Sequence, residues 1–122
     1  MARPRLYYTF QDQATSDSDG NELLVERFLS PFDIVDDCDV ITIEISGTAV
    51  SGTTHFELKV TPDGDYYPIA GIRPNDYFIS AVSTGINEVW WFDIGAFYSF
   101  RCRVSDVSGG NITIKGKISK YI

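Results

Sequence analysis

The sequence predicts an all-β protein folded as a two-sheet antiparallel β-sandwich. Apolar and polar residues alternate with a period of two in many short segments, which is typical of strands. Turn residues separate these segments at intervals of about 8–12 residues, and no window holds a sustained helical repeat. Strands with one apolar face need a second sheet to cover that face. We therefore expect about seven to nine strands, with a jelly roll as one compatible wiring.

The period-two pattern predicts the strands in chain order. Segment 22–29, ELLVERFL, is too short for a sustained helical repeat and is interpreted as a strand, and residues 78–82 form a further short strand. Gly116 lies on an apolar row and indicates a bulge or a close approach of another element. The residues expected to face the core are Ile41, Ile43 and Ile45, then Phe56, Leu58 and Val60, then Tyr98, Phe100, Cys102 and Val104, and finally Ile112, Ile114 and Ile118.

The chain length favours one domain over residues 1–122. A composition of 43% hydrophobic and 14% aromatic residues supplies a real core and excludes a disordered chain. Residues 1–5 contain a proline and two arginines, and we expect them to form a flexible N-terminal arm.

An acidic segment, residues 15–26, approaches the pattern of a calcium-binding loop. Asp17, Asp19 and Glu26 fall at ligand positions, and a glycine falls at the sharp turn. The first ligand position lacks its aspartate, and the flanking text is strand-like rather than helical. We therefore favour a hairpin whose turn uses Gly20 in the left-handed conformation.

A second acidic run, DIVDDCD at residues 33–39, is interpreted as a solvated loop rather than a cation site. The two cysteines, Cys38 and Cys102, are too few for a disulfide framework. Two free buried thiols are the default, and a single disulfide stays open. The sequence predicts no resident metal and no cofactor.

The stretch TPDGDYYPIAG raises the question of a metal or catalytic loop, because two aspartates flank a glycine. We interpret Asp63-Gly64 as a hairpin turn in which Gly64 takes the left-handed conformation. Tyr66 and Tyr67 then begin the return strand on opposite faces, and Pro68 indicates that this strand lies at a sheet edge.

The sequence favours a protein that is not an enzyme. His55 is the sole histidine and alternation places it on a polar strand face beside Glu57. The nearby Ser51, Thr53 and Thr54 show no nucleophile-elbow pattern. Acidic residues are so frequent that a glycosidase-like carboxylate pair has no specificity. A surface histidine is expected.

The aromatic residues carry the strongest signal for binding. Adjacent tryptophans in a strand point to opposite faces, so one side chain is expected inside and the other outside. An exposed tryptophan or tyrosine suits a protein interface or the face of a sugar. The candidate interface residues are Trp90, Trp91, Tyr66, Tyr67, Arg101 and Arg103.

The charge distribution limits the partner class. A net charge of −7 disfavours nucleic acid, whose phosphates are bound by lysine and arginine. Residues 1–65 hold 13 acidic and 4 basic residues, whereas residues 66–122 hold 4 acidic and 6 basic residues. This asymmetry either serves solubility or allows head-to-tail contact between copies. No apolar run is long enough for a signal peptide or a membrane span, so we expect synthesis in a cytoplasm.

Taken in order, several motifs between residues 40 and 122 resemble those of small β-sandwich virion proteins of tailed bacteriophages and prophages. Each motif is weak alone, and their order makes the resemblance, which covers about two thirds of the chain. The motifs are Phe56-Glu57, Asp63-Gly64, Tyr67-Pro68-Ile69, Trp91-Phe92-Asp93-Ile94, residues 100–105 and residues 109–116.

This resemblance implies a non-enzymatic virion component: a capsid decoration, head-fibre, neck or tail accessory protein made in the host bacterial cytoplasm. Its partners would be other virion proteins, and it would form a homo-oligomer in the virion. Neither nucleic acid nor membrane is expected as a partner. The alternative is a carbohydrate-binding or adhesin module, because exposed aromatic rings can stack on sugars.

Overall fold

The computed structural model describes residues 5–25, 40–94 and 97–119. Four features predicted from the sequence lie outside the described residues: the first four residues of the N-terminal arm, Glu26, the acidic run 33–39 with Cys38, and the end of the strand expected at 22–29. No helix in the described ranges is long and apolar enough to cross a membrane.

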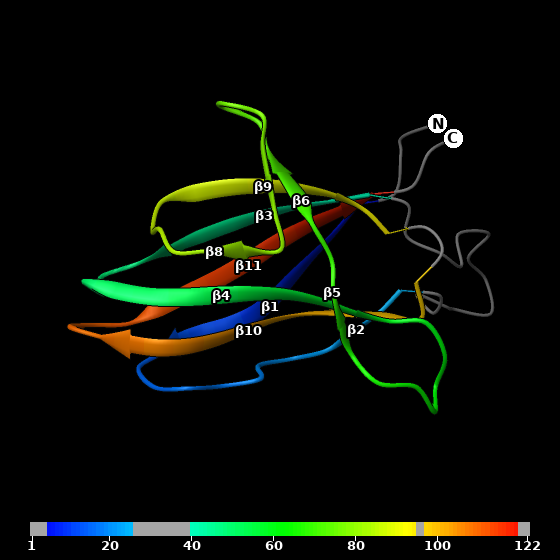
Figure 1. Ribbon diagram of the computed structural model, residues 1–122, viewed down its shortest axis with the longest axis horizontal. Helices are drawn as coiled ribbons and strands as arrows, with labels where there is room; N and C mark the ends of the chain where they lie inside the picture. The colour runs from blue at the N-terminus through cyan, green and yellow to red at the C-terminus, as the bar shows by residue number, and fades with distance from the viewer. Residues whose placement is uncertain (1–4, 26–39, 95–96, 120–122) are drawn as a thin grey trace.

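The protein is an all-β sandwich of two antiparallel sheets, as the alternation predicts (Figure 1). The six-stranded sheet has the order β1-β11-β3-β9-β6-β7, and the five-stranded sheet comprises β2-β10-β4-β5, with β8 also pairing with β4. The strands are β1 (Arg5–Ala14), β2 (Leu23–Leu24), β3 (Val40–Gly47), β4 (Ser51–Lys59), β5 (Tyr67–Pro68), β6 (Gly71–Arg73), β7 (Phe78–Ser80), β8 (Val82–Ser83), β9 (Glu88–Asp93), β10 (Ser99–Ser108) and β11 (Ile112–Ser119).

Five aromatic rings form a continuous row through the interior, and we call this row the aromatic zipper. Their order through the core is Phe10, Phe100, Phe92, Phe56 and Trp90, with neighbouring centroids 4.7–5.7 Å apart. Successive rings come from alternate sheets, because β1 and β9 belong to the six-stranded sheet and β4 and β10 to the five-stranded one. Offset and edge-to-face contacts at these distances stabilise the packing beyond the burial of area.

The rows of isoleucines predicted in β3 and β11 are buried as expected, but the row predicted in β4 is wrong at its end. Phe56 is buried, Leu58 is half-buried and Val60 is exposed. The strand ends at Lys59, whose carbonyl oxygen accepts a hydrogen bond from the Tyr98 amide, so Val60 already belongs to a surface loop. Thr54, two residues before Phe56 on the inward row of β4, is buried instead.

Two predicted short strands also differ. Residues 78–82 form two strands instead of one, since β7 pairs with β6 in one sheet and β8 pairs with β4 in the other. The chain crosses between the sheets at Ala81, which alternation within five residues cannot reveal. In segment 22–29, the described strand is Leu23–Leu24, and Val25 is already in a turn.

The glycines show which turns require positive φ. Gly20 has φ +69°, as predicted, but the predicted hairpin is wrong because β1 and β2 belong to different sheets. Gly64 is not among the positive-φ residues; its amide donates to the Thr61 carbonyl oxygen at 3.1 Å within a wider loop, so the tight hairpin was wrong. Gly116 marks a close approach, because a Cβ there would lie 2.9 Å from Ile41 Cδ1 and 3.0 Å from Phe10 Cε2.

Candidate functional site

The six candidate interface residues lie in separate places. Trp90 is fully buried in the aromatic zipper, so its side chain cannot contact a partner of the folded domain. Trp91 is 49% exposed on the outer face of the six-stranded sheet. Arg101 and Arg103 face outward from the five-stranded sheet, and the Tyr66 ring packs against Arg101. Tyr67 is exposed on β5, which is an edge strand as Pro68 predicted.

The charged side chains on the five-stranded sheet neutralise one another. The Glu57 carboxylate accepts hydrogen bonds from Arg101 Nε at 2.8 Å and Arg103 Nη2 at 3.1 Å. Burial would raise the pKa of Glu57, but the hydrogen bonds from Arg103 and Arg101 outweigh burial and hold it below its usual range. The Arg101 guanidinium also lies 3.9 Å from the centre of the Tyr66 ring. These arginines are already paired, so this face offers a partner little free charge.

A serine and the sole histidine meet on the same face. His55 Nε2 lies 2.9 Å from Ser105 Oγ, a pair that sequence reasoning missed because the residues are 50 positions apart. Burial and then the Arg103 charge lower the pKa of His55. No carboxylate among the described side chains forms a hydrogen bond with Nδ1, which a nucleophile–base–acid triad needs.

The two described aspartates of the calcium-like segment make contacts within the protein. Asp17 Oδ1 accepts a hydrogen bond from the Asp106 amide at 3.0 Å, and Asp19 lies 3.7 Å from Arg101 Nη1. Within the described part of the chain, no group of three His, Cys, Asp or Glu side chains could hold a metal ion. Asp17 therefore caps the Asp106 amide, and Asp19 forms a surface ion pair with Arg101. Glu26 lies outside the described residues.

The outer face of the six-stranded sheet carries a row of side chains, one from each strand. The register pairs Tyr7 with Lys117, Lys117 with Thr42, Thr42 with Trp91, Trp91 with Ile72, and Ile72 with Ile79. The row is polar in its middle and apolar toward β7. We define the apolar patch as Trp91, Ile72 and Ile79 together with Val89, which lies two residues from Trp91 on the same face.

The β6–β7 hairpin extends this patch beyond the sandwich. Its tip projects past β9 at the top of Figure 1. Its large side chains Ile72, Tyr77, Phe78 and Ile79 are all exposed, with Tyr77 at 76% and Ile79 at 64%. Sequence reasoning missed this element because the pairing of β6 with β9 joins residues without any local periodic pattern.

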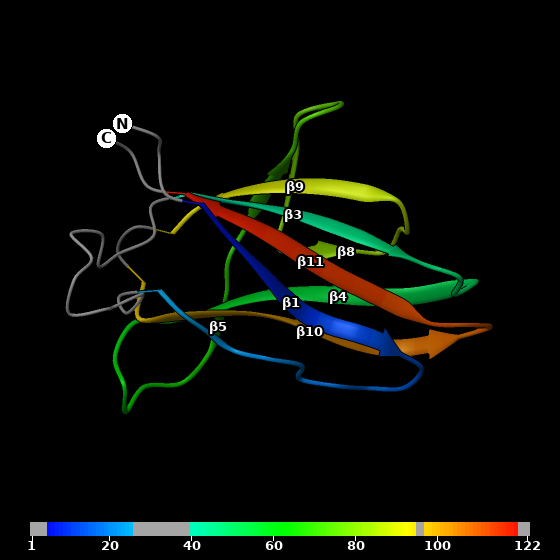
Figure 2. The ribbon, with the colours of Figure 1, turned by 180° about the vertical axis from the view of Figure 1, so that it is seen from behind.

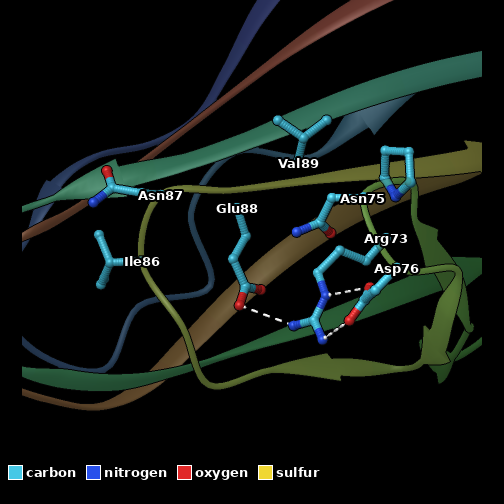
Figure 3. Close-up of a pocket in the computed structure, with 8 residues that line it drawn as sticks. Arg73, Asn75, Asp76, Ile86, Asn87, Glu88 and Val89 are labelled. Carbon is cyan, nitrogen blue, oxygen red and sulfur yellow. Dashed lines mark hydrogen bonds and ion pairs between the residues drawn. The ribbon is translucent and has the colours of Figure 1, made fainter.

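An ion network links the turn of the hairpin to the start of β9 (Figure 3). Arg73 donates from Nε and Nη2 to the two Asp76 oxygens at 2.9 and 2.7 Å, and from Nη1 to Glu88 Oε2 at 3.0 Å. The other Glu88 oxygen accepts from Ser83 Oγ at 2.5 Å and Trp90 Nε1 at 3.0 Å. Every charged side chain of this network has a partner, so its role in holding the hairpin explains the pocket that these residues line.

Comparison with known proteins decides the family. The XepA family model matches residues 5–118. The chain belongs to the XepA family. One relative, the SPbeta prophage-derived uncharacterized protein YomS of Bacillus subtilis strain 168, is 29% identical over 109 residues, covering 89% of this chain and 82% of the relative. Another, the phage-like element PBSX protein XepA of the same strain, is 28% identical over 115 residues, which is 94% of this chain but 37% of the relative.

Solved structures of the same two XepA family members share the fold. The crystal structure of YomS has a TM-score of 0.84 and 26% identity, covering 98% of this chain and 96% of that one. The crystal structure of the PBSX exported protein XepA has a TM-score of 0.86 and 26% identity, covering 98% of this chain and 39% of that one. The relatives come from a prophage and a phage-like element, and this chain is accordingly phage-related.

Proposed function

We propose that this chain is a non-enzymatic phage structural protein that works in the virion by protein–protein assembly, as a decoration, head-fibre, neck or tail accessory subunit. The observation that carries the proposal is the apolar patch on the outer face of the six-stranded sheet. The relatives' phage origin supports the same assignment, and the virion location is part of the proposal.

The two outer faces of the sandwich differ in a way that favours the patch as the contact surface. On the five-stranded sheet, Arg101 and Arg103 are bound to Glu57, so a partner would have to break existing pairs. On the six-stranded sheet, Trp91 and Ile79 expose apolar atoms to water. Covering such a surface releases water and favours association, and aromatic residues often dominate interface energetics.

We further propose that the subunit is a homo-oligomer in the virion. The acidic first half and weakly basic second half of the chain would allow contacts between unlike surfaces of neighbouring copies. Light scattering of the purified protein tests this point, and a mass equal to one chain at all concentrations would contradict it.

The assembly role is tested with particles of the encoding phage produced without this gene. Purified protein is added back, and bound protein is measured after gradient sedimentation. We expect wild type to co-sediment with heads or tails, and the Trp91→Ser and Ile79→Ser variants to lose binding at least tenfold. Arg103→Gln, on the opposite face, is the matched control and should bind like wild type. Absence of the wild-type protein from every particle fraction would refute the virion role.

Carbohydrate binding is the second candidate, favoured by one observation. Tyr7 and Trp91 lie on the same cross-strand row, with Lys117 and Thr42 between them. Aromatic rings with intervening hydrogen-bonding side chains suit the alternating apolar faces and hydroxyl edges of a sugar chain. A glycan array and a cell-wall pull-down test it, with Tyr7→Ala and Trp91→Ala as loss-of-binding variants. An array without hits, together with no retention by cell walls, would remove this candidate.

A further inference from the structure

Tyr77 adopts a backbone conformation that bulky residues avoid. Its φ is +58°, in the left-handed region where a Cβ crowds the backbone. The residue lies at the tip of the β6–β7 hairpin and 76% of its surface is exposed, so burial of its ring does not compensate for the strain. Strain at an exposed aromatic residue is a reason to look for a function.

The hairpin is built to hold this conformation. The Tyr77 amide donates to the Arg73 carbonyl oxygen at 2.7 Å, which closes the turn. The Asp76 carboxylate accepts the Phe78 amide at 3.3 Å while it binds the Arg73 guanidinium. That guanidinium also lies 5.0 Å from the Phe78 ring and 5.6 Å from the Trp90 ring, so the turn is anchored to the buried core.

We propose that Tyr77 is a preorganised plug that inserts into a concave pocket of a partner protein, with Arg73 and Asp76 as its positioning residues. This inference rests on the proposed assembly function and names its anchor and the shape of its partner. A turn whose backbone is fixed before binding loses little conformational entropy on insertion. Aromatic side chains that fill pockets are typical binding hot spots.

The charges around the hairpin favour a protein over a lipid surface. Anionic bilayers attract lysine and arginine, but Arg73 is held by Asp76 and Glu88. Residues 74–80 contain no lysine or arginine, and the whole chain has a net charge of −7. Electrostatic attraction to an anionic membrane is therefore missing at the point where the aromatic ring projects.

The decisive variant is Tyr77→Asn, because asparagine tolerates positive φ better than tyrosine does. The strained-plug model predicts opposite effects on two measurements: thermal unfolding moves to higher temperature, while affinity for particles lacking the native protein falls at least tenfold. Tyr67→Asn is the matched control, since Tyr67 is also exposed but lies at the edge of the other sheet. It should leave binding unchanged.

The positioning role is tested with Asp76→Asn, which keeps Tyr77 but removes the charge that holds Arg73. We expect weaker particle binding and faster proteolysis within residues 73–78. Membrane binding is tested in parallel with vesicles of phosphatidylethanolamine and about 30 mol% phosphatidylglycerol, because anionic lipids attract basic residues. If wild type binds the vesicles and Tyr77→Asn does not, the proposal that Tyr77 enters a pocket of a protein is wrong.

The outcomes separate the inference from the proposed function. If Tyr77→Asn binds particles like wild type while Trp91→Ser does not, assembly stands and the plug is wrong. If Tyr77→Asn fails to raise the unfolding temperature, the strain argument is wrong. If wild type binds no particle, both the virion role and the plug are refuted.

Discussion

Trp90 and Trp91 are consecutive in β9, yet the first indole is fully buried in the aromatic zipper and the second lies on the outer face of the sheet. Trp90 also donates its Nε1 hydrogen to Glu88 Oε1 at 3.0 Å, so it joins the core to the ion network of Glu88, Arg73 and Asp76. Neighbouring residues in one strand thus have separate environments, one in the packed core and one on the solvent-exposed face of the sheet.

Substitution should separate the two tryptophans. Trp90→Ala should lower the free energy of unfolding by about 3–5 kcal/mol, because it leaves a large cavity in the core. Trp91→Ala should change it by no more than about 0.5 kcal/mol, since the side chain is half exposed. Urea denaturation followed by far-ultraviolet circular dichroism measures both. Similar losses in the two variants would contradict the packing described for β9.

Glu57 should make the protein sensitive to acid. Its pKa in the folded state lies below the ordinary value of 4.5 because Arg103 and Arg101 outweigh burial. The unfolded chain therefore binds a proton first, and the stability contributed by Glu57 is complete above about pH 4.5 and declines as the pH falls through the folded pKa.

The measurement is the urea midpoint between pH 7 and pH 3 for wild type and Glu57→Gln. The variant should be less stable at pH 7, because both arginines lose their carboxylate, and its stability should fall less steeply with acidification. Parallel pH profiles for the two proteins would show that Glu57 does not contribute in this way.

Gly71 should be intolerant of any side chain. A Cβ at this position would lie 2.4 Å from two atoms of the Phe92 ring, which is itself wedged into the aromatic zipper. Gly71→Ala should therefore cost about 1–3 kcal/mol of stability through overpacking. Gly64→Ala is the control, because its nearest contact would be the Thr61 hydroxyl at 2.9 Å, the end of a side chain in a surface loop. Equal stabilities of the two variants would contradict the close approach.

The Cys102 thiol should be inert in the folded protein. It is free and fully buried, and burial raises its pKa well above the ordinary value. In a Cys38→Ser variant, Ellman's reagent should react with one thiol only when the protein is unfolded, since the thiolate is the reactive form. Rapid labelling without denaturant would mean that β10 opens in the native state.

The sequence was sufficient for the fold class and for the inward rows of β3 and β11, whereas Arg5, expected in a flexible arm, begins β1. Alternation correctly placed Ile41 and Ile45 in the core, and the described residues contain no helix, as an apolar period of two predicts. The pairing of β6 with β9 could not be predicted from the sequence, since only the folded sheet brings Ile72 beside Trp91. The same is true of the crossing at Ala81, where one apparent strand divides between two sheets.

The site was only partly accessible to sequence reasoning. Strand periodicity predicts that one of the two tryptophans faces out but not which one, and it cannot show that Arg101 is already paired with Glu57. Nor does it reveal that Tyr77 has a positive φ, because tyrosine rarely adopts that conformation. Contacts between residues distant in the chain and unusual backbone angles both require the folded structure.

The position of β11 between β1 and β3, visible in Figure 2, has a kinetic consequence. β1 comes first in the chain, but its partner in the sheet is residues 112–119. Closing a loop of this length is slow, because chain entropy opposes it before any contact forms. On the ribosome, the first strand would have to wait until residues 112–119 have emerged. Emergence of β11, rather than growth of the N-terminal half, should therefore trigger completion of the six-stranded sheet.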